Sequence, residues 1–246
     1  MIKKIILVIL GLFDFFYQRK IMHFFKEKNI HELNCVFDIG AHKGETIKLL
    51  LKYFKINKII SFEASPKNFK YLKQTKKKVD KKYPKTDLIV ENIALGSNEK
   101  QVAFKQFNES SSSTISDIDE GSSYYKKKFK LLNFFGKTNN FDTINLNTKK
   151  LINYINQKKI YQIDLLKIDT EGFEFEILKG LEDKIKLVKI IMFEHHYDNM
   201  IKKNYTFSDI NAHLKNNKFK KVLKLKMPFR KTFEYFYFNE DQNWKK

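Results

Sequence analysis

Acidic side chains and a histidine pair follow two apolar runs of the sequence, where strands should end. Asp169 and Glu171 come directly after the run 163–168, and Glu194 with His195 follows the run 187–193. A positioned carboxylate or imidazole can take a proton from a substrate hydroxyl, which contributes about 10²–10⁴-fold to a rate. These four residues form the predicted catalytic set. His195 or Glu171 is the leading candidate for the general base. Asp169 and Glu194 would orient the substrate that carries the hydroxyl or bind its polar groups.

Two other uses of the same residues stay open. The carboxylates and the histidine could hold a hard divalent cation that lowers the pKa of an acceptor hydroxyl. Asp169 or Thr170 could instead cap the helix that follows. We favour catalysis or substrate binding without a metal, and the sequence leaves metal ligands undetermined. Of His195 and its neighbour His196, one should point into the cleft and one away.

A second group of residues has the features of a cofactor site. Gly40 follows the apolar run that contains Asp38, and a glycine there allows a tight turn and close approach of a ligand. Glu63 ends the next apolar run, and an acid about 20 positions after a glycine turn commonly binds ribose hydroxyls. The three-glycine dinucleotide pattern and the G-x-x-x-x-G-K-[ST] loop are both absent. Asp38 suits a cationic ligand, so S-adenosylmethionine, which has a ribose but no phosphate, fits best.

The elements that must position these residues alternate along the chain. Helical periodicity after Gly44, a helix opened by Pro66, and helical patterns around 151–155, 173–181 and 208–215 separate the apolar runs. The predicted strands are 36–39, 58–62, 88–90, 102–107, 163–168, 187–193, 219–225 and 233–238. This order predicts an α/β fold with a doubly wound, mostly parallel sheet and at least one antiparallel edge formed by the last two strands. In such a sheet a ligand lies at the carboxyl ends of the strands.

The chain divides into an N-terminal helical or apolar segment, 1–34, and one domain, 35–246, with a polar lid or insertion at 108–140. The apolar run 5–13 is shorter than the roughly 20 residues that span a bilayer, and it lacks a signal-peptide cleavage site. We favour a helix packed on the domain. The alternative is an in-plane anchor, in which residues 1–20 contact a membrane surface. The predicted location is the cytoplasm, with peripheral attachment to the inner face of a membrane as the alternative.

The net charge of the chain is weak evidence about its binding partners. The 246 residues include 48 Lys or Arg and 28 Asp or Glu, for a formal net charge of +20, but only Arg19 and Arg230 are arginines. Because arginine supplies the bidentate contacts favoured in nucleic-acid recognition, the surplus does not favour a nucleic-acid partner. The lysine runs 76–78 and 126–128 are interpreted as solvated faces, with an anionic glycan, a phosphate-bearing carrier or a membrane as the alternative. The single cysteine, Cys35, cannot form an intramolecular disulfide.

Four segments resemble the FkbM family of class I S-adenosylmethionine-dependent methyltransferases. They are 36–41 (VFDIGA), 61–66 (SFEASP), 92–96 (NIALG) and, most specifically, 165–174 (LLKIDTEGFE). The resemblance implies a Rossmann-like, seven-stranded sheet with an antiparallel C-terminal hairpin. It also implies that Gly40 and Ala41 face the methionine part of the cofactor, that Glu63 binds the ribose, and that Asn92 and Ile93 lie near the adenine. Asn147 departs from the family, which often has an acid there.

We therefore predict an S-adenosylmethionine-dependent O-methyltransferase that acts on a hydroxyl of a carbohydrate or related small molecule, in glycan or small-molecule biosynthesis. The alternatives are a nucleic-acid methyltransferase or binder, and a non-catalytic membrane-associated protein that kept the fold. The Asn-Pro-Pro-Tyr type of loop used for amino-group methylation is replaced by 169–172 (DTEG). The sequence leaves the acceptor, the metal dependence and the oligomeric state undetermined.

Overall fold

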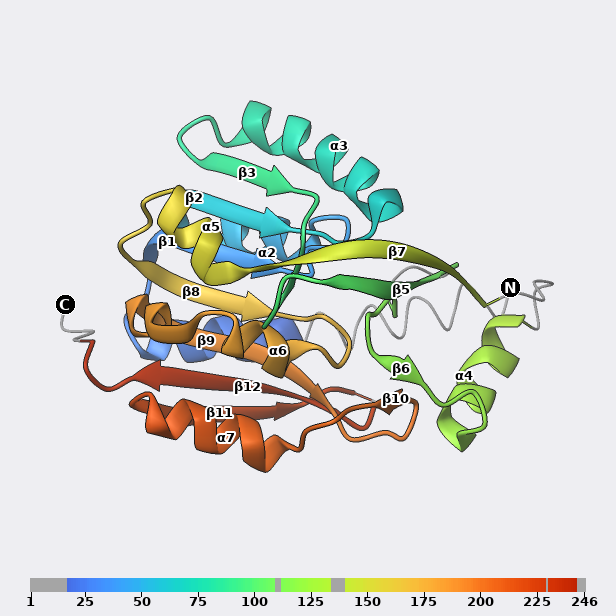
Figure 1. Ribbon diagram of the computed structural model, residues 1–246. Coiled ribbons are helices and arrows are strands. Elements are labelled where there is room, and N and C mark those ends of the chain that lie inside the picture. The colour runs from blue at the N-terminus through green and yellow to red at the C-terminus, as the bar shows by residue number, and fades with distance from the viewer. Residues whose placement is uncertain (1–16, 109–111, 134–139, 229, 243–246) are drawn as a thin grey trace.

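A seven-stranded sheet forms the centre of the protein (Figure 1). The computed structural model describes residues 17–108, 112–133, 140–228 and 230–242. The strand order is β11-β12-β9-β8-β1-β2-β3. In chain order, these strands are β1 (Glu32–Ile39), β2 (Lys55–Phe62), β3 (Asp87–Glu91), β8 (Ile163–Ile168), β9 (Val188–His196), β11 (Phe219–Lys226) and β12 (Thr232–Asn239).

The sheet is parallel except at one strand. β1 pairs in parallel with β2 and β8, β2 with β3, and β8 with β9, whereas β12 runs antiparallel to both β9 and β11. This arrangement confirms the predicted α/β fold, with its mostly parallel seven-stranded sheet and antiparallel C-terminal strands. The chain builds outward from β1 in one direction and then continues from β8 in the other, so the strand order reverses between β1 and β8. A ligand is expected at the carboxyl ends of these two strands.

Helices cover both faces of the sheet because side chains alternate along each strand. One apolar cluster joins the sheet to the helix at 17–27, α2 and α3, and the other joins it to α5, α6 and α7. Every residue of β8 is buried, as expected of a central strand covered on both faces. The helices are α2 (Glu45–Tyr53), α3 (Pro66–Lys82), α5 (Leu151–Gln157), α6 (Glu174–Lys179), the short 3₁₀ helix η1 (Glu182–Leu187) and α7 (Phe207–Asn216).

Two smaller sheets and a helix lie at the end where the parallel strands finish (Figure 1). β4 (Ala94–Gly96), β7 (Phe141–Lys150) and β5 (Gln101–Phe107) form one small sheet, and β6 (Asp117–Ile118) pairs with β10 (Ile201–Lys202). The predicted strand 102–107 is therefore a strand, but it lies outside the central sheet. The polar segment 108–140 contains β6 and α4 (Ser123–Asn133), and its residues 109–111 and 134–139 lie outside the described residues. Its role as a lid, like the boundary between 34 and 35, stays a prediction.

The helix at 17–27 packs on the central sheet. Phe25 is fully buried, and its ring lies 5.3 Å from that of Phe54 and 5.8 Å from that of Phe236, measured between centroids. The Tyr17 hydroxyl donates a 2.8 Å hydrogen bond to Glu234 on β12. Residues 1–16, which include the apolar run, lie outside the described residues, so membrane contact through them stays a prediction. Across the described ranges, no helix is long and apolar enough to cross a membrane.

Replacing Phe25 with alanine should lower the free energy of unfolding by about 3–5 kcal/mol, because it leaves a cavity between the helix and the sheet. Urea denaturation followed by circular dichroism measures this change. The control is Lys26→Ala on the exposed face of the same helix, which should shift the free energy of unfolding by less than about 0.5 kcal/mol. Equal stability of the two variants would show that the helix does not pack as described.

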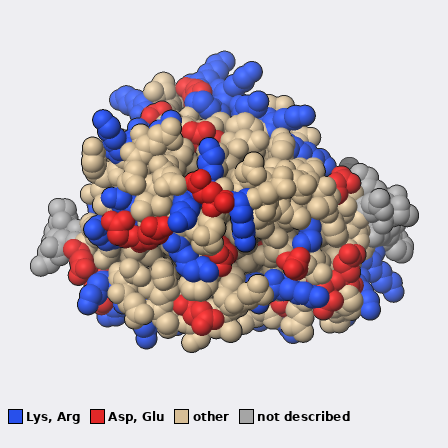
Figure 2. All heavy atoms as spheres, in the orientation of Figure 1, with Lys and Arg blue, Asp and Glu red and all other residues tan. Residues whose placement is uncertain are grey.

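On the face shown in Figure 2, the basic residues are spread out rather than gathered in a single patch. Figure 2 shows Lys and Arg side chains across the visible face, densest at the top over α3 and interspersed with Asp and Glu. Lys77 and Lys78 are exposed, and Lys76 pairs with Asp80 at 3.0 Å. Exposed ion pairs of this kind contribute little to stability.

Candidate active site

A cavity of about 440 Å³ lies at the carboxyl ends of β1, β2, β8 and β9, where the strand order reverses. Seven of the ten predicted site residues line it, and three do not. Those in its walls are Gly40, Ala41, Glu63, Ile93, Asp169, Glu171 and Glu194, and those outside are Asp38, Asn92 and His195. The structure thus brings seven of the ten predicted residues to one cavity.

The turn after β1 brings two backbone segments into close contact at one end of the cavity. The N–H groups of Gly40 and Ala41 both donate to the Phe62 carbonyl, at 2.9 and 3.0 Å. Gly40 has a φ of +78°, and a Cβ built on it would lie 1.7 Å from the Asp169 carbonyl oxygen. Only glycine fits this position. A Cβ would collide with the backbone of the loop after β8, and the left-handed conformation is unfavourable for residues that have a side chain. The cavity wall here is therefore bare backbone.

Glu63 presents a buried carboxylate to the same end of the cavity. One of its oxygens accepts a 2.7 Å hydrogen bond from the His42 N–H, and the other accepts a 2.8 Å hydrogen bond from the Ser65 N–H. Burial raises the pKa of Glu63 to about 7, although these backbone donors act against the rise. Asn92 lies outside the cavity, and its amide donates to the Glu63 carbonyl at 2.7 Å. Asn92 thus fixes the loop that carries Glu63.

Asp38 is fully buried and lies beneath the cavity wall rather than in it. Its carboxylate is 3.5 Å from the ammonium of Lys167, which is itself 3.3 Å from the Asp169 carboxylate. Burial raises the pKa of Asp38, and Lys167 opposes that rise. Burial also disfavours the charge of Lys167, but Asp169 and Asp38 outweigh it and raise the pKa of the ammonium. Lys167 therefore links the predicted cofactor acid to the predicted catalytic acid.

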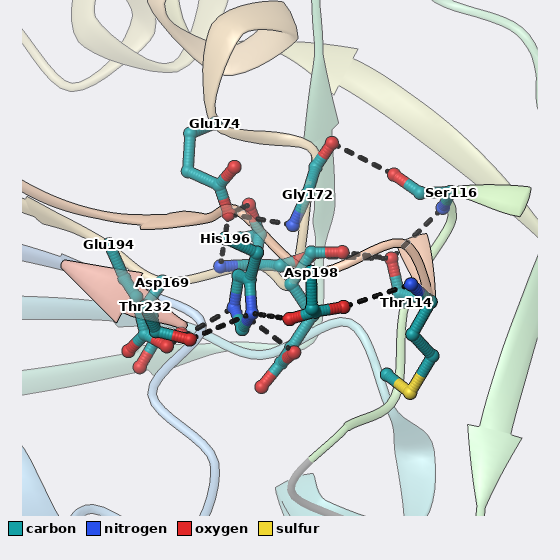
Figure 3. A network of polar contacts seen from close by, with 12 residues as sticks. Thr114, Ser116, Asp169, Gly172, Glu174, Glu194, His196, Asp198 and Thr232 are labelled. Carbon is teal, nitrogen blue, oxygen red and sulfur yellow. Dashed lines mark hydrogen bonds and ion pairs between the residues drawn. The ribbon is translucent and has the colours of Figure 1, made fainter. Parts of the chain in front are cut away.

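A histidine and two glutamates meet at the other end of the cavity (Figure 3). Nε2 of His196 lies 3.3 Å from Oε2 of Glu171 and 3.1 Å from Oε1 of Glu194. Burial would lower the pKa of His196, but Glu171, Asp198 and Glu194 raise it well above its usual value. Burial and the nearby Asp169 charge raise the pKa of Glu194. Together these groups form a compact acidic cluster around one imidazole.

His195 points away from this cluster, because neighbouring residues of β9 face opposite sides of the sheet. Its ring lies among those of Tyr197, Phe207 and Tyr205, at centroid distances of 4.8, 5.8 and 6.0 Å. Burial lowers its pKa to about 3, so the ring is neutral. The structure therefore does not bring His195 to the cavity, and His196 takes the place that we expected for it. The two-residue spacing from Glu194 to His196 is the sequence signal that identifies the correct histidine.

The loop after β8 is held by a residue that the predicted set omits. Glu174 is fully buried, and its Oε1 accepts hydrogen bonds from the N–H groups of Thr170 and Gly172 at 3.2 and 2.9 Å. The Tyr205 hydroxyl donates to its other oxygen at 2.7 Å. Glu171, in the left-handed conformation with φ 53°, lies between these anchors. Glu174 thus positions the loop so that Glu171 reaches the cavity.

The sequence also gave no signal for two residues on β12 and the N-terminal helix. Glu234 lines the cavity and accepts the Tyr17 hydrogen bond, and burial raises its pKa to about 8. These residues are brought to the cavity only by the antiparallel pairing of β12 with β9, where Glu234 lies opposite Glu194.

Comparison with protein families now identifies the chain. The model of the methyltransferase FkbM domain matches residues 38–221, which include the turn after β1, the loop after β8 and the histidine cluster. The chain belongs to the FkbM methyltransferase family. This match confirms the resemblance seen in the sequence, and with it the class of S-adenosylmethionine-dependent methyltransferases.

One solved structure supports the fold of this FkbM-family protein. An FkbM methyltransferase from Methylobacillus flagellatus KT is 16% identical with a TM-score of 0.55, over 84% of this chain and 44% of that one. The chain thus spans less than half the length of that relative. Magnesium protoporphyrin IX methyltransferase from Synechocystis PCC 6803, solved with bound S-adenosylmethionine, is 10% identical with a TM-score of 0.49, over 91% of this chain and 78% of that one. Comparison with curated proteins finds no match.

Proposed function

We propose that this FkbM-family protein transfers a methyl group from S-adenosylmethionine to a hydroxyl of a carbohydrate or related small molecule. The observation that carries the proposal is a single cavity with two unlike ends. Gly40, Ala41 and Glu63 line one end, and the carboxylates of Glu171 and Glu194 line the other. A methyl donor and a hydroxyl acceptor need such ends side by side.

The residues at the first end fit S-adenosylmethionine. The bare backbone at Gly40 leaves room that a Cβ would fill, and it would face the methionine part of the cofactor together with Ala41. The Glu63 carboxylate would accept hydrogen bonds from the ribose hydroxyls, since an ionised carboxylate has lone pairs beyond those used by His42 and Ser65. Ile93 would lie beside the adenine. Asp38 would act indirectly, through its ion pair with Lys167. Asn92 would act by holding the loop that carries Glu63.

At the second end, the chain's own residues align the acceptor and take its proton. The cofactor supplies a methyl group that its sulfonium already makes electrophilic, so the acceptor oxygen forms the new bond to carbon as the bond from carbon to sulfur breaks. Alignment of two such reactants is worth about 7–11 kcal/mol. We assign Glu171 as the general base, with Asp169 and Glu194 orienting the acceptor. An ionised carboxylate accepts hydrogen bonds and donates none, which suits a substrate with several hydroxyl donors.

A screen for methyl transfer tests the proposed function. The protein is incubated with S-adenosylmethionine and a panel of sugars, other small alcohols, amines and RNA, and the products are analysed by mass spectrometry. We expect a methyl gain on a hydroxyl acceptor together with S-adenosylhomocysteine. Methyl gain confined to amines or to RNA would overturn the proposed acceptor class.

The affinity for S-adenosylmethionine should rise between pH 6 and pH 8. Because the pKa of Glu63 is about 7, the side chain is mostly neutral at pH 6 and mostly ionised at pH 8. A ribose hydroxyl donates more strongly to the ionised form, so affinity should increase up to roughly ten-fold over this range. Isothermal titration calorimetry at several pH values measures the change. The control is Glu63→Gln, in which any remaining pH dependence of the affinity comes from other groups, including the amino group of the ligand. If the affinity of this variant changed as steeply with pH, the role of Glu63 would be contradicted.

A further inference from the structure

We propose that Glu171, Glu194 and His196 form a binding site for one divalent transition-metal ion, with Mn²⁺ and Zn²⁺ as the best candidates. The site lies at the acidic end of the cavity, where Glu171 and Glu194 form part of the wall. This inference concerns binding of the ion, and it does not require the proposed methyl transfer.

The three side chains have the spacing of ligands around one ion. Nε2 of His196 is 3.3 Å from the Glu171 carboxylate and 3.1 Å from the Glu194 carboxylate, and one ligand atom from each residue lies within 4.8 Å of the others. Ligand atoms about 2.0–2.2 Å from a metal lie about 3–3.5 Å apart when they occupy neighbouring positions of a tetrahedron or octahedron. An ion can therefore bind with small side-chain shifts.

Two of these atoms are buried without a hydrogen-bond partner. His196 is 7% exposed and Glu194 is 5% exposed, and neither Nε2 of the histidine nor Oε1 of the glutamate makes a hydrogen bond despite their 3.1 Å separation. An ion between them would satisfy both atoms at once.

The other side of the imidazole is held in the orientation that a metal ligand needs. Nδ1 of His196 lies 3.4 Å from Oδ2 of Asp198 and 3.2 Å from the Thr232 hydroxyl. Asp198 is itself fixed by the Met200 N–H, which donates to its other oxygen at 2.9 Å. Because ionised Asp198 can only accept, it favours the hydrogen on Nδ1, so Nε2, which faces the glutamates, is the nitrogen that would release its proton on binding an ion. Histidine ligands of metals commonly donate their second nitrogen to a carboxylate in this way.

The charge of the cluster also favours a cation. Glu171, Glu194 and Asp198 surround one imidazole, which can contribute at most a single positive charge. The cationic side chains Arg230 and Lys203 act on Glu194 and Asp198 respectively, and Lys203 donates its hydrogen bond to the His196 carbonyl. One imidazole nitrogen with two carboxylate oxygens is a mixed set that suits Mn²⁺ or Zn²⁺ better than an all-oxygen ion such as Ca²⁺. Three protein ligands would leave positions open toward the cavity, where an ion lowers the pKa of a bound hydroxyl.

Metal titration of the dialysed full chain tests the inference. The protein is freed of metal with EDTA and titrated with MnCl₂ and with ZnCl₂ by isothermal titration calorimetry. We expect one ion per chain, a loss of that binding in His196→Gln, and weakening of about 10–100-fold in Asp198→Asn, which removes only the orienting charge. The matched control is His195→Gln, whose imidazole faces the opposite side of the sheet, and it should bind the ion as the unaltered protein does.

A spectroscopic measurement keeps the test independent of the folding of the variants. In the unaltered protein, pulsed electron paramagnetic resonance of bound Mn²⁺ should show nitrogen coupling from one imidazole. Absence of binding by both ions, or binding that survives in His196→Gln, would overturn the inference. Metal binding without methyl transfer would leave the inference standing and count against the proposed function. Methyl transfer by protein that binds no metal would support the proposed function and overturn the inference.

Discussion

Replacing Gly40 with alanine should abolish measurable binding of S-adenosylmethionine. The new Cβ would lie 1.7 Å from the Asp169 carbonyl oxygen, so the turn after β1 and the loop after β8 must separate. Separation would strain the hydrogen bonds from Gly40 to Phe62 and from Asp169 to Ile39, both of which close this end of the cavity. The left-handed conformation adds about 1–2 kcal/mol of its own for a residue with a side chain. Calorimetric titration measures the loss, and thermal unfolding reports whether the variant is folded.

The control for this prediction is Gly121→Ala. Gly121 lies before α4, away from the cavity walls, and the nearest atom to its added Cβ is a side-chain oxygen of Asp119 at 3.1 Å, which can move. This variant should bind the cofactor normally. If folded Gly40→Ala bound S-adenosylmethionine as tightly as Gly121→Ala does, the assignment of the turn after β1 to the cofactor would be wrong.

Replacing Glu171 with glutamine should lower the turnover number by about 10²–10⁴-fold, which is the usual contribution of a positioned general base. The affinity for S-adenosylmethionine should change little, because the proposed contacts with the cofactor are made by Gly40, Ala41 and Glu63 and not by the Glu171 carboxylate. Single-turnover kinetics with a hydroxyl acceptor measures the chemical step, and calorimetry measures cofactor binding. A variant that loses both together would have lost its fold rather than its base.

A comparison with His195→Phe distinguishes the two bases that the sequence left open. The His195 ring already packs among aromatic rings and Nδ1 has no hydrogen-bond partner, so phenylalanine should fit with little loss of stability. We expect nearly unchanged turnover in this variant. A large loss in His195→Phe with none in Glu171→Gln would reverse the assignment.

The sequence predicted the central sheet well because most of its strands contain a run of apolar residues. β8 and β9 are buried on both faces and are rich in apolar residues. A glycine or an acidic residue directly follows β1, β2 and β8, and Glu194 lies near the end of β9. Chain order alone then placed Gly40, Glu63, Asp169 and Glu194 at one edge. The physical rule that parallel strands present their carboxyl ends together gave most of the site.

The parts that the sequence did not predict depend on contacts between distant segments. β7 is half exposed and alternates polar with apolar residues, so its sequence FDTINLNTKK lacks the continuous apolar run of a central strand. Its position between β4 and β5 comes from pairing across the chain. Glu234 and Tyr17 reach the cavity from β12 and from the helix at 17–27, and neither has a neighbouring motif to identify it.

The histidine pair shows how one strand register changes the chemistry that is inferred. The sequence interpretation included His195 and considered a metal site the lesser alternative. Once β9 is in register, His196 and Glu194 share one face and His195 occupies the other. The contact of His196 with Asp198 then adds a reason for a metal that the sequence alone did not provide.

The central claim is that the cavity at the ends of β1, β2, β8 and β9 binds S-adenosylmethionine. Isothermal titration calorimetry of the unaltered protein with S-adenosylmethionine tests it most directly. We predict binding of one molecule per chain, weakened by about 100-fold or more in Glu63→Ala, since hydrogen bonds to a charged group contribute about 1.5–3 kcal/mol each. No binding by the folded protein, or binding of equal affinity in Glu63→Ala, would contradict the account.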